Sequence, residues 1–164
     1  MSVLLEYLPW FWLPLVAISL LFVSCASTPT ETAEQNAEAQ EKMDQAFEEV
    51  YNHFDQVLIM DGAKDYKVKS GDTLSSIAKD FYGKDNGYYF PMIMLASSQT
   101  ILDPDMIEPG MVLTIPDLQK NLNDSSAHQN MKKFFQEIAD VYKTKKTATA
   151  KKTREELQKI ASKL

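Results

Sequence analysis

The feature that most constrains the fold is the stretch 66–116, which has a strand-like pattern at each end. Tyr66 and Val68 alternate with lysines at its start, the period of a strand with one buried and one solvent-exposed face. Leu113 and Ile115 show the same alternation at its end. We expect the two strands to pair antiparallel, with these four side chains on one face of the sheet.

Two helices are expected between those strands. Gly71 ends the first strand, and Asp72 or Thr73 can accept a hydrogen bond from the first free N–H groups of a helix. The apolar stripe of that helix has helical spacing and consists of Leu74, Ile77, Ala78 and Phe81. The segment 88–96 is apolar enough for a second, buried helix, although Pro91 confines any regular start to the residues around it.

Two turns lead from the second helix into the last strand. Asp103-Pro104-Asp105 predicts a turn, and Pro109-Gly110 fits the second and third positions of a type II turn. The order of strand, helix, helix and strand predicts an α+β fold. Its centre would be a βααβ unit with a two-stranded antiparallel sheet, flanked by N-terminal and C-terminal helices.

The stretch resembles the LysM (lysin motif) family, in order and at the family's usual spacing, over about a third of the chain. The residues that carry the resemblance are Tyr66, Val68, Gly71-Asp72-Thr73-Leu74, Ile77-Ala78, Phe81-Tyr82-Gly83, Asp103-Pro104-Asp105, Ile107, Pro109-Gly110 and Leu113-Thr114-Ile115-Pro116. The resemblance implies a LysM domain at 65–117 that binds glycans containing N-acetylglucosamine, most often peptidoglycan in bacteria. Phe90 stands where the family commonly has Trp, and Ser97 where an Asn commonly ends the second helix.

The resemblance also implies the position of the glycan site. One wall would be the loop entering the first helix, and the other the loop leaving the second helix. The residues of the two walls would be Gly71, Asp72, Thr73 and Leu74, and Ile101, Leu102, Asp103 and Pro104. Backbone groups of such loops hold hydroxyl and N-acetyl groups well, and small apolar side chains suit the acetyl methyl group. The alternative for Asp72 and Thr73 is that they only cap a helix.

The sequence contains no pattern that indicates catalysis. His53 and His128 lie in different segments without the spacing of zinc ligands. Asp103 and Asp105 flank Pro104, where the resemblance implies a turn and not a catalytic dyad. We therefore expect a binding protein that is not an enzyme, with no metal and no cofactor.

The N-terminal segment 1–24 is predicted to be a signal peptide or a membrane segment, because residues 7–24 are apolar and carry no charge. Cys25 follows a small residue at the end of this run, as in a bacterial lipoprotein signal, which makes it the candidate lipidation site. An uncleaved membrane anchor is the alternative. Either interpretation puts the LysM-like stretch outside the cytoplasm. The polar segment 25–39 is predicted to be a tether.

An amphipathic helix is predicted over 40–60. Its apolar side chains recur at spacings of four and three residues, at Met43, Phe47, Val50, Phe54 and Val57. We expect this side to pack on the LysM-like unit or on a C-terminal helix. A coiled-coil dimer is the alternative, but the seam is short and its aromatic side chains are bulky for such an interface.

A polar connector is predicted over 118–130, and C-terminal helices with a basic low-complexity segment over 131–164. One apolar face comprises Met131, Phe134, Phe135, Ile138, Val141 and Tyr142. This face is expected to meet Phe47 and Phe54 and to enlarge the core, or else to dock a partner. The basic segment suits anionic lipid or wall polymers, and its lack of interleaved aromatic residues argues against nucleic acid.

These observations predict a membrane-anchored envelope lipoprotein that grips peptidoglycan strands and acts as a tether or targeting module, facing the periplasm or cell wall. The charge is uneven: residues 25–130 carry 7 basic against 18 acidic residues, and 131–164 carry 10 against 4. A structural adaptor whose flanking helices recruit an envelope protein is the first alternative. A receptor for a glycan other than peptidoglycan is the second.

Overall fold

The computed structural model describes the backbone of residues 29–164, with side chains from residue 33 onward. The expected signal or membrane segment at 1–24 and the lipidation site Cys25 lie outside the described residues. A βααβ unit is formed by β1 (Lys64–Lys67), α2 (Leu74–Tyr82), α3 (Pro91–Ala96) and β2 (Val112–Ile115), with short 3-10 turns η1 (Gly87–Tyr89) and η2 (Pro104–Met106). The flanking helices are α1 (Pro29–His53), α4 (Leu118–Asn123), α5 (Ser125–Val141) and α6 (Ala150–Lys163).

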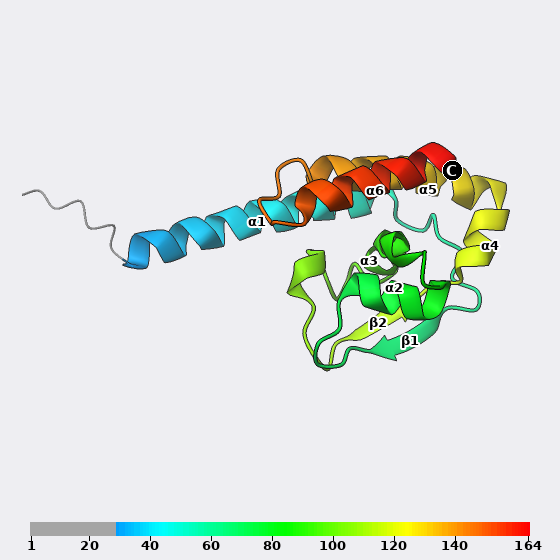
Figure 1. Cartoon of the computed structure of the whole chain (residues 1–164), viewed down its shortest axis with the longest axis horizontal. Coiled ribbons are helices and arrows are strands. Elements are labelled where there is room, and N and C mark those ends of the chain that lie inside the picture. The colour runs from blue at the N-terminus through cyan, green and yellow to red at the C-terminus, as the bar shows by residue number, and fades with distance from the viewer. Residues whose placement is uncertain (1–28) are drawn as a thin grey trace, which may run out of the picture.

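The flanking helices form a layer over the βααβ unit. Figure 1 shows α5 and α6 side by side above α2 and α3, with the C-terminal half of α1 beside them and the sheet on the far side of the unit. The N-terminal half of α1 projects away from this body. The expected α+β fold, with a two-stranded antiparallel sheet and helices on both flanks, is confirmed.

The two strands pair antiparallel, with Tyr66 opposite Leu113. Beyond the strands, the N–H of Val68 donates to Met111 O (2.8 Å) and Gly110 N–H donates to Val68 O (2.9 Å). The turn before β2 is closed by the N–H of Met111, which donates to Glu108 O at 3.2 Å. Gly110 has φ +100° there, which a type II turn requires at its third position.

Helix α2 begins at a capping box, in which Thr73 and Ser76 exchange hydrogen bonds between side chain and backbone. Leu74, Ile77 and Ala78 are buried as expected. Phe81 differs from the prediction, because its side chain is 38% exposed. It lies in the last turn of α2, where it packs edge-on against the ring of Tyr66 at the rim of the sheet, with ring centroids 5.5 Å apart.

Helix α3 is shorter than the predicted segment 88–96, because the chain first makes the 3-10 turn η1. Pro91 occupies the first turn of α3, where its missing N–H costs nothing. Phe90 is buried and fills the core, as its place in the sequence suggested. Ser97 is buried at the end of α3, where its hydroxyl accepts from Thr114 N (2.9 Å) and donates to Thr114 O (3.4 Å). Ser97 thereby fastens α3 to β2.

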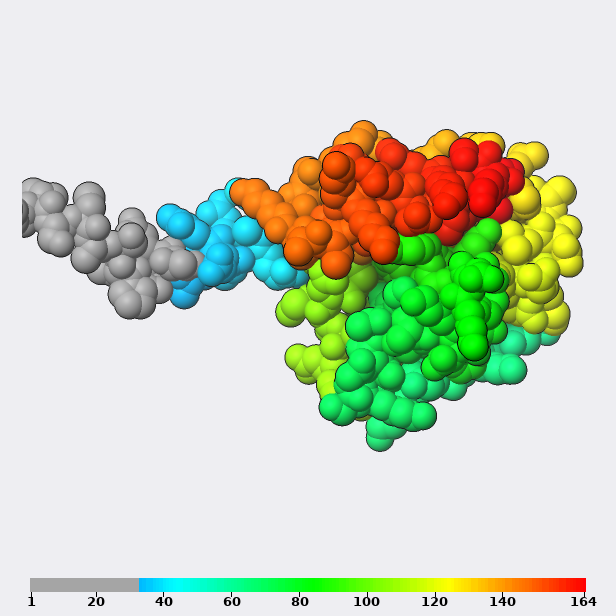
Figure 2. Space-filling view, in the orientation of Figure 1, coloured from blue at the N-terminus to red at the C-terminus, as the bar shows by residue number. Residues whose placement is uncertain are grey.

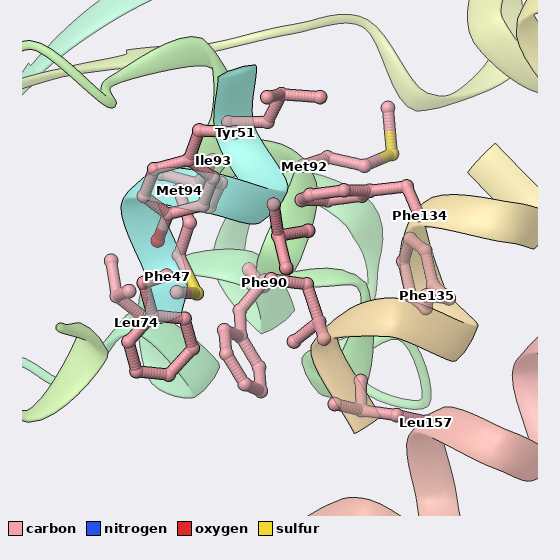
Figure 3. Close-up of a cluster of buried hydrophobic side chains, with 14 of the residues drawn as sticks. Phe47, Tyr51, Leu74, Phe90, Met92, Ile93, Met94, Phe134, Phe135 and Leu157 are labelled. Atoms are coloured by element: carbon pink, nitrogen blue, oxygen red, sulfur yellow. The ribbon is translucent and has the colours of Figure 1, made fainter. Parts of the chain in front are cut away.

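The apolar faces of the flanking helices complete the core (Figure 3). Phe54, the residue after α1, contacts Phe134 of α5, with ring centroids 5.4 Å apart, and Phe47 of α1 lies edge-on to Tyr142 at 6.1 Å. Tyr89 of η1 lies edge-on to Phe135 at 5.6 Å. The face of α1 is therefore buried within the chain and does not form the seam of a coiled coil. The face of α5 is likewise not a docking surface.

Three predicted segments differ from the structure in their boundaries. Helix α1 begins at Pro29, so the part 29–39 of the predicted tether is helical, and α1 ends at His53, before the predicted end of the amphipathic helix. The expected polar connector 118–130 contains α4 and the start of α5, because the side chains of Asp117 and Asp124 cap these helices. The basic segment becomes helical from Ala150 onward.

Candidate functional site

The loop that enters α2 is held by its own side chains. The Asp72 carboxylate accepts hydrogen bonds from the backbone N–H of Lys69 and from the hydroxyl of Tyr66, each at 2.8 Å. The Lys69 bond and then the Tyr66 bond lower the pKa of the Asp72 carboxyl below its ordinary value. Gly71 is exposed, has φ +87° and has no neighbouring atom within 4 Å of where a Cβ would be. Asp72 and Thr73 therefore fix the loop, and Gly71 leaves its backbone accessible.

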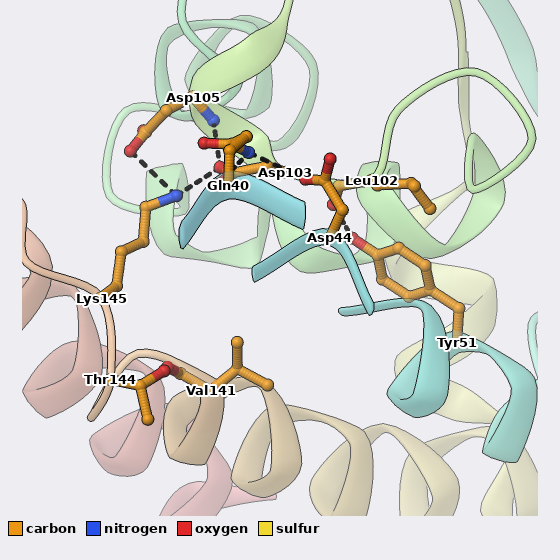
Figure 4. Close-up of polar contacts among 9 residues, drawn as sticks. All are labelled: Gln40, Asp44, Tyr51, Leu102, Asp103, Asp105, Val141, Thr144 and Lys145. Atoms are coloured by element: carbon orange, nitrogen blue, oxygen red, sulfur yellow. Dashed lines mark hydrogen bonds and ion pairs between the residues drawn. The ribbon is translucent and has the colours of Figure 1, made fainter. Parts of the chain in front are cut away.

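The loop that leaves α3 is held by contacts with residues outside the LysM stretch. Ile101 is 4% exposed and Asp103 is 2% exposed, so neither side chain faces solvent. Tyr51 of α1 donates its hydroxyl to Leu102 O at 2.6 Å. This bond holds the backbone of the loop against α1 (Figure 4).

Asp103 makes most of the polar contacts that hold this loop, as Figure 4 shows. Its carboxylate accepts from Asp105 N at 2.8 Å, which caps η2, and from Gln40 Nε2 at 3.3 Å. The ammonium of Lys145, from the loop between α5 and α6, pairs with it as well. Lys145 also contacts Asp105 at 3.1 Å and is 9% exposed. Asp103 therefore holds the turn together, whereas the resemblance had also placed it in a wall of the glycan site, and its side chain is buried.

A groove with a volume of about 280 Å³ lies between the two loops. It is lined by Thr73, Leu74, Ser75, Tyr88, Phe90, Pro104, Asp105, Tyr142, Thr149 and Thr153. The structure thus brings three of the eight expected residues together: Thr73, Leu74 and Pro104. Gly71 and Asp72 form the turn just before the groove, and Ile101 and Asp103 are buried behind its wall.

The side chain of Leu102 does not line this groove. It lines a separate cavity of about 400 Å³, which runs between the end of α1 and the residues that follow α3. The other residues of this cavity are Glu48, Tyr51, Asn52, Asp55, Ser98, Gln99 and Thr100. Leu102 therefore does not share a surface with Thr73 and Leu74.

The sequence prediction missed the aromatic and C-terminal parts of the groove. Tyr88 and Phe90 come from η1 and the residue after it, and Tyr142 from the end of α5. Burial raises the pKa of the Tyr142 hydroxyl, so it stays protonated. The high aromatic content of 88–90 is a signal that could have found two of these residues. Nothing local in the sequence marks Thr149 or Thr153, which lie among lysines.

The groove combines aromatic rings with hydroxyl groups. Such a surface suits a sugar ring, whose apolar face rests on aromatic groups while its hydroxyls find hydrogen-bond partners at the rim. Within residues 29–164, no group of three or more His, Cys, Asp or Glu side chains is arranged to hold a metal ion. Over the same residues, no helix has the length and apolar character needed to cross a bilayer.

Comparison with known proteins identifies the unit that supplies most of the residues lining this groove. Residues 66–116 match the LysM domain, and they form a LysM domain in this chain. The chain is also 50% identical over 52 residues to the potassium binding protein Kbp of Escherichia coli O6:H1 (strain CFT073), to which it is homologous. The match covers 32% of this chain, which spans about a third (34%) of the length of that relative. No solved structure matches the chain.

Proposed function

We propose that this protein binds peptidoglycan without cleaving it, through the groove between the α2 entry loop and η2. The observation that carries the proposal is that one cavity joins Thr73 and Leu74 to Pro104 within a LysM domain, a kind of domain that binds glycan strands. The ligand would be a segment containing N-acetylglucosamine. Its ring would rest on Tyr88, which is partly exposed, and its acetyl methyl group would lie near the buried side chains of Leu74 and Phe90 that line the groove.

We propose a revised glycan site that takes this geometry into account. In this site Thr73 is the exposed contact residue, Leu74 and Pro104 are buried side chains that line the groove, and the exposed Gly71 lies just before it. Asp103 and Ile101 act by holding the second wall, because their side chains are buried. Leu102 is assigned to the loop's fastening through its carbonyl group, which accepts from Tyr51.

We further propose that the protein is anchored in the cell envelope by lipidation of Cys25. LysM domains are typically associated with the envelope, and the uncharged run 7–24 ends at this cysteine. With a lipid at Cys25 and a glycan in the groove, the chain would connect a membrane to the wall. Labelled palmitate should be incorporated by the wild type and not by Cys25→Ser. Equal incorporation by both proteins would reject this anchor.

The adaptor alternative has less support. It assigned partner recruitment to the apolar faces of 43–57 and 131–142. Phe47, Phe54 and Phe134 of these faces are buried, and the rings of Phe54 and Phe134 pack on each other. An adaptor would need another surface. Cross-linking in cells separates the two functions, because an adaptor should keep its partner when the groove is blocked.

Retention on purified, insoluble peptidoglycan tests the proposal directly. The fragment 26–164 should sediment with peptidoglycan and be released by soluble N-acetylglucosamine oligomers. Retention on chitin but not on peptidoglycan would identify a receptor for a different glycan. Absence from both pellets would reject glycan binding. Because the similar protein is named for potassium binding, the assay should be repeated in sodium and potassium salts at equal ionic strength.

A further inference from the structure

Besides the loop that enters α2 (first wall) and the loop that leaves α3 (second wall), the groove has a third wall, which comes from outside the LysM domain. Tyr142 follows the end of α5, Thr149 precedes α6, and Thr153 lies in the first turn of α6. All of them line the same cavity as Thr73 and Pro104. In the space-filling view the C-terminal helices lie directly against the upper side of the LysM domain (Figure 2). The groove is therefore built by two parts of the chain that are distant in sequence.

The third wall is fixed in position by Lys145. The Lys145 ammonium pairs with Asp103 and Asp105 of the second wall, and its side chain is only 5% exposed. The same ammonium lies over the ring of Phe47, 5.5 Å from its centroid, and over the ring of Tyr142 at 5.8 Å. Such contacts of a cation with aromatic faces are favourable when water is excluded. The loop between α5 and α6 is thus tied to η2, the element that begins at Pro104.

Helix α6 is held independently of that ion pair. Its side chains Leu157 and Ala161 are buried, and α6 contacts both α5 and η1. Thr149 is exposed and makes no capping hydrogen bond to α6. Its hydroxyl group is therefore not committed to the helix and is available at the groove.

We propose that Thr149 and Thr153 contact the bound glycan and limit which saccharides the groove accepts. The inference rests on the proposed glycan-binding function. A volume of about 280 Å³ is below the usual range of ligand pockets, roughly 300–1,000 Å³, so the groove takes a short saccharide segment. The two threonines supply uncharged hydroxyl groups opposite the α2 entry loop. The LysM domain with this third wall has a narrower specificity than its two loops alone would give.

The test uses the fragment 26–164 and N-acetylglucosamine oligomers, with the dissociation constant measured by calorimetry. Thr149→Trp fills the groove from an exposed position and should weaken binding at least about tenfold, a change of about 1.4 kcal/mol. Thr153→Val keeps the shape of the side chain and removes its hydroxyl, and should weaken binding several-fold. Thr147→Trp is the matched control, because Thr147 is exposed in the same loop and does not line the groove.

The outcomes separate this inference from the function on which it rests. If the wild type binds and Thr149→Trp and Thr153→Val bind equally well, glycan contacts only the LysM loops and the third wall has no role. Equal weakening by Thr147→Trp and Thr149→Trp would also overturn the inference, because the effect would not come from the groove. A wild type that binds no oligomer and no peptidoglycan contradicts the proposed function itself.

Discussion

The ammonium of Lys145 is paired with the carboxylate of Asp103, and both side chains are almost completely buried. The pair joins the loop between α5 and α6 to the turn that carries Pro104. It therefore connects the C-terminal helices to one wall of the groove. Removing one charge from such a pair leaves the other buried without compensation.

We predict that Lys145→Met lowers the free energy of unfolding by roughly 3–5 kcal/mol, because Asp103 keeps its buried charge and loses its cationic partner. Urea denaturation measures the change. Lys146→Met is the control, because Lys146 is exposed and a surface change of this kind stays within about 0.5 kcal/mol. Similar urea midpoints for the two variants would show that the buried pair contributes nothing to stability.

Asn121 should be equally hard to replace. Its side chain is completely buried, accepts from Ile59 N at 2.8 Å, and donates to Ile59 O (3.0 Å) and Asp117 O (2.9 Å). Asn121→Ala should destabilise the fold by about 3 kcal/mol, since the lost bonds leave backbone groups without partners. Asn123→Ala, in the same helix but exposed, should change little. An Asn121→Ala protein as stable as Asn123→Ala would contradict this role.

Ser97→Ala should weaken the junction of α3 with β2. The substitution removes the hydroxyl that accepts from Thr114 N, and an unsatisfied backbone donor costs roughly 1–3 kcal/mol. Thermal unfolding of Ser97→Ala and of the neighbouring variant Ser98→Ala measures the difference. A Ser97→Ala protein that unfolds at the same temperature as Ser98→Ala, or at a higher one, would show that the hydroxyl of Ser97 does not hold α3 to β2.

The Asp72 carboxylate should make stability depend on pH in the acid range. Its pKa is lowered in the folded chain by hydrogen bonds from Lys69 N and the Tyr66 hydroxyl. A lowered folded pKa adds stability above the unfolded value of about 3.9, and this stability is lost as the pH falls through the folded pKa. Asp72→Asn should therefore unfold at a lower temperature than the wild type at pH 6, with the two converging at the lowest pH.

The exposed variant Asp65→Asn serves as the comparison for this experiment, since Asp65 lies on β1 outside the loop. A gap between wild type and Asp72→Asn that stays constant at every pH would mean that ionisation of Asp72 is not the cause.

The βααβ unit could be predicted from the sequence because its signals are local. Strand alternation around Val68, the apolar stripe of α2 and the turn at Gly110 each depend on a few neighbouring residues. Phe81 was placed wrongly, since helical spacing shows which side of a helix is apolar but not how far the core extends along it. Its ring packs on Tyr66 at the rim of the sheet instead.

The complete groove could not be predicted for a different reason. Thr149 and Thr153 reach the groove through tertiary contacts: α6 packs on α5 and η1, and Lys145 of the preceding loop pairs with Asp103, a contact across 42 residues of sequence. A low-complexity basic segment gives no indication of such a partner. The resemblance to LysM domains supplied two loops and identified Thr73, Leu74 and Pro104. Asp103 is buried where it pairs with Gln40 and Lys145, two residues outside the stretch that carries the resemblance.

The most direct test of the central claim is the retention of fragment 26–164 on insoluble peptidoglycan, compared between Tyr88→Ala and Phe81→Ala. Tyr88 lines the groove. Phe81 is an aromatic residue in the last turn of α2, at the end away from Leu74, and does not line the groove. If glycan is bound in the groove, Tyr88→Ala should lose most of the retention and Phe81→Ala should keep it, with both variants folded by circular dichroism. Wild-type retention by Tyr88→Ala, or the same loss in both variants, would contradict the account.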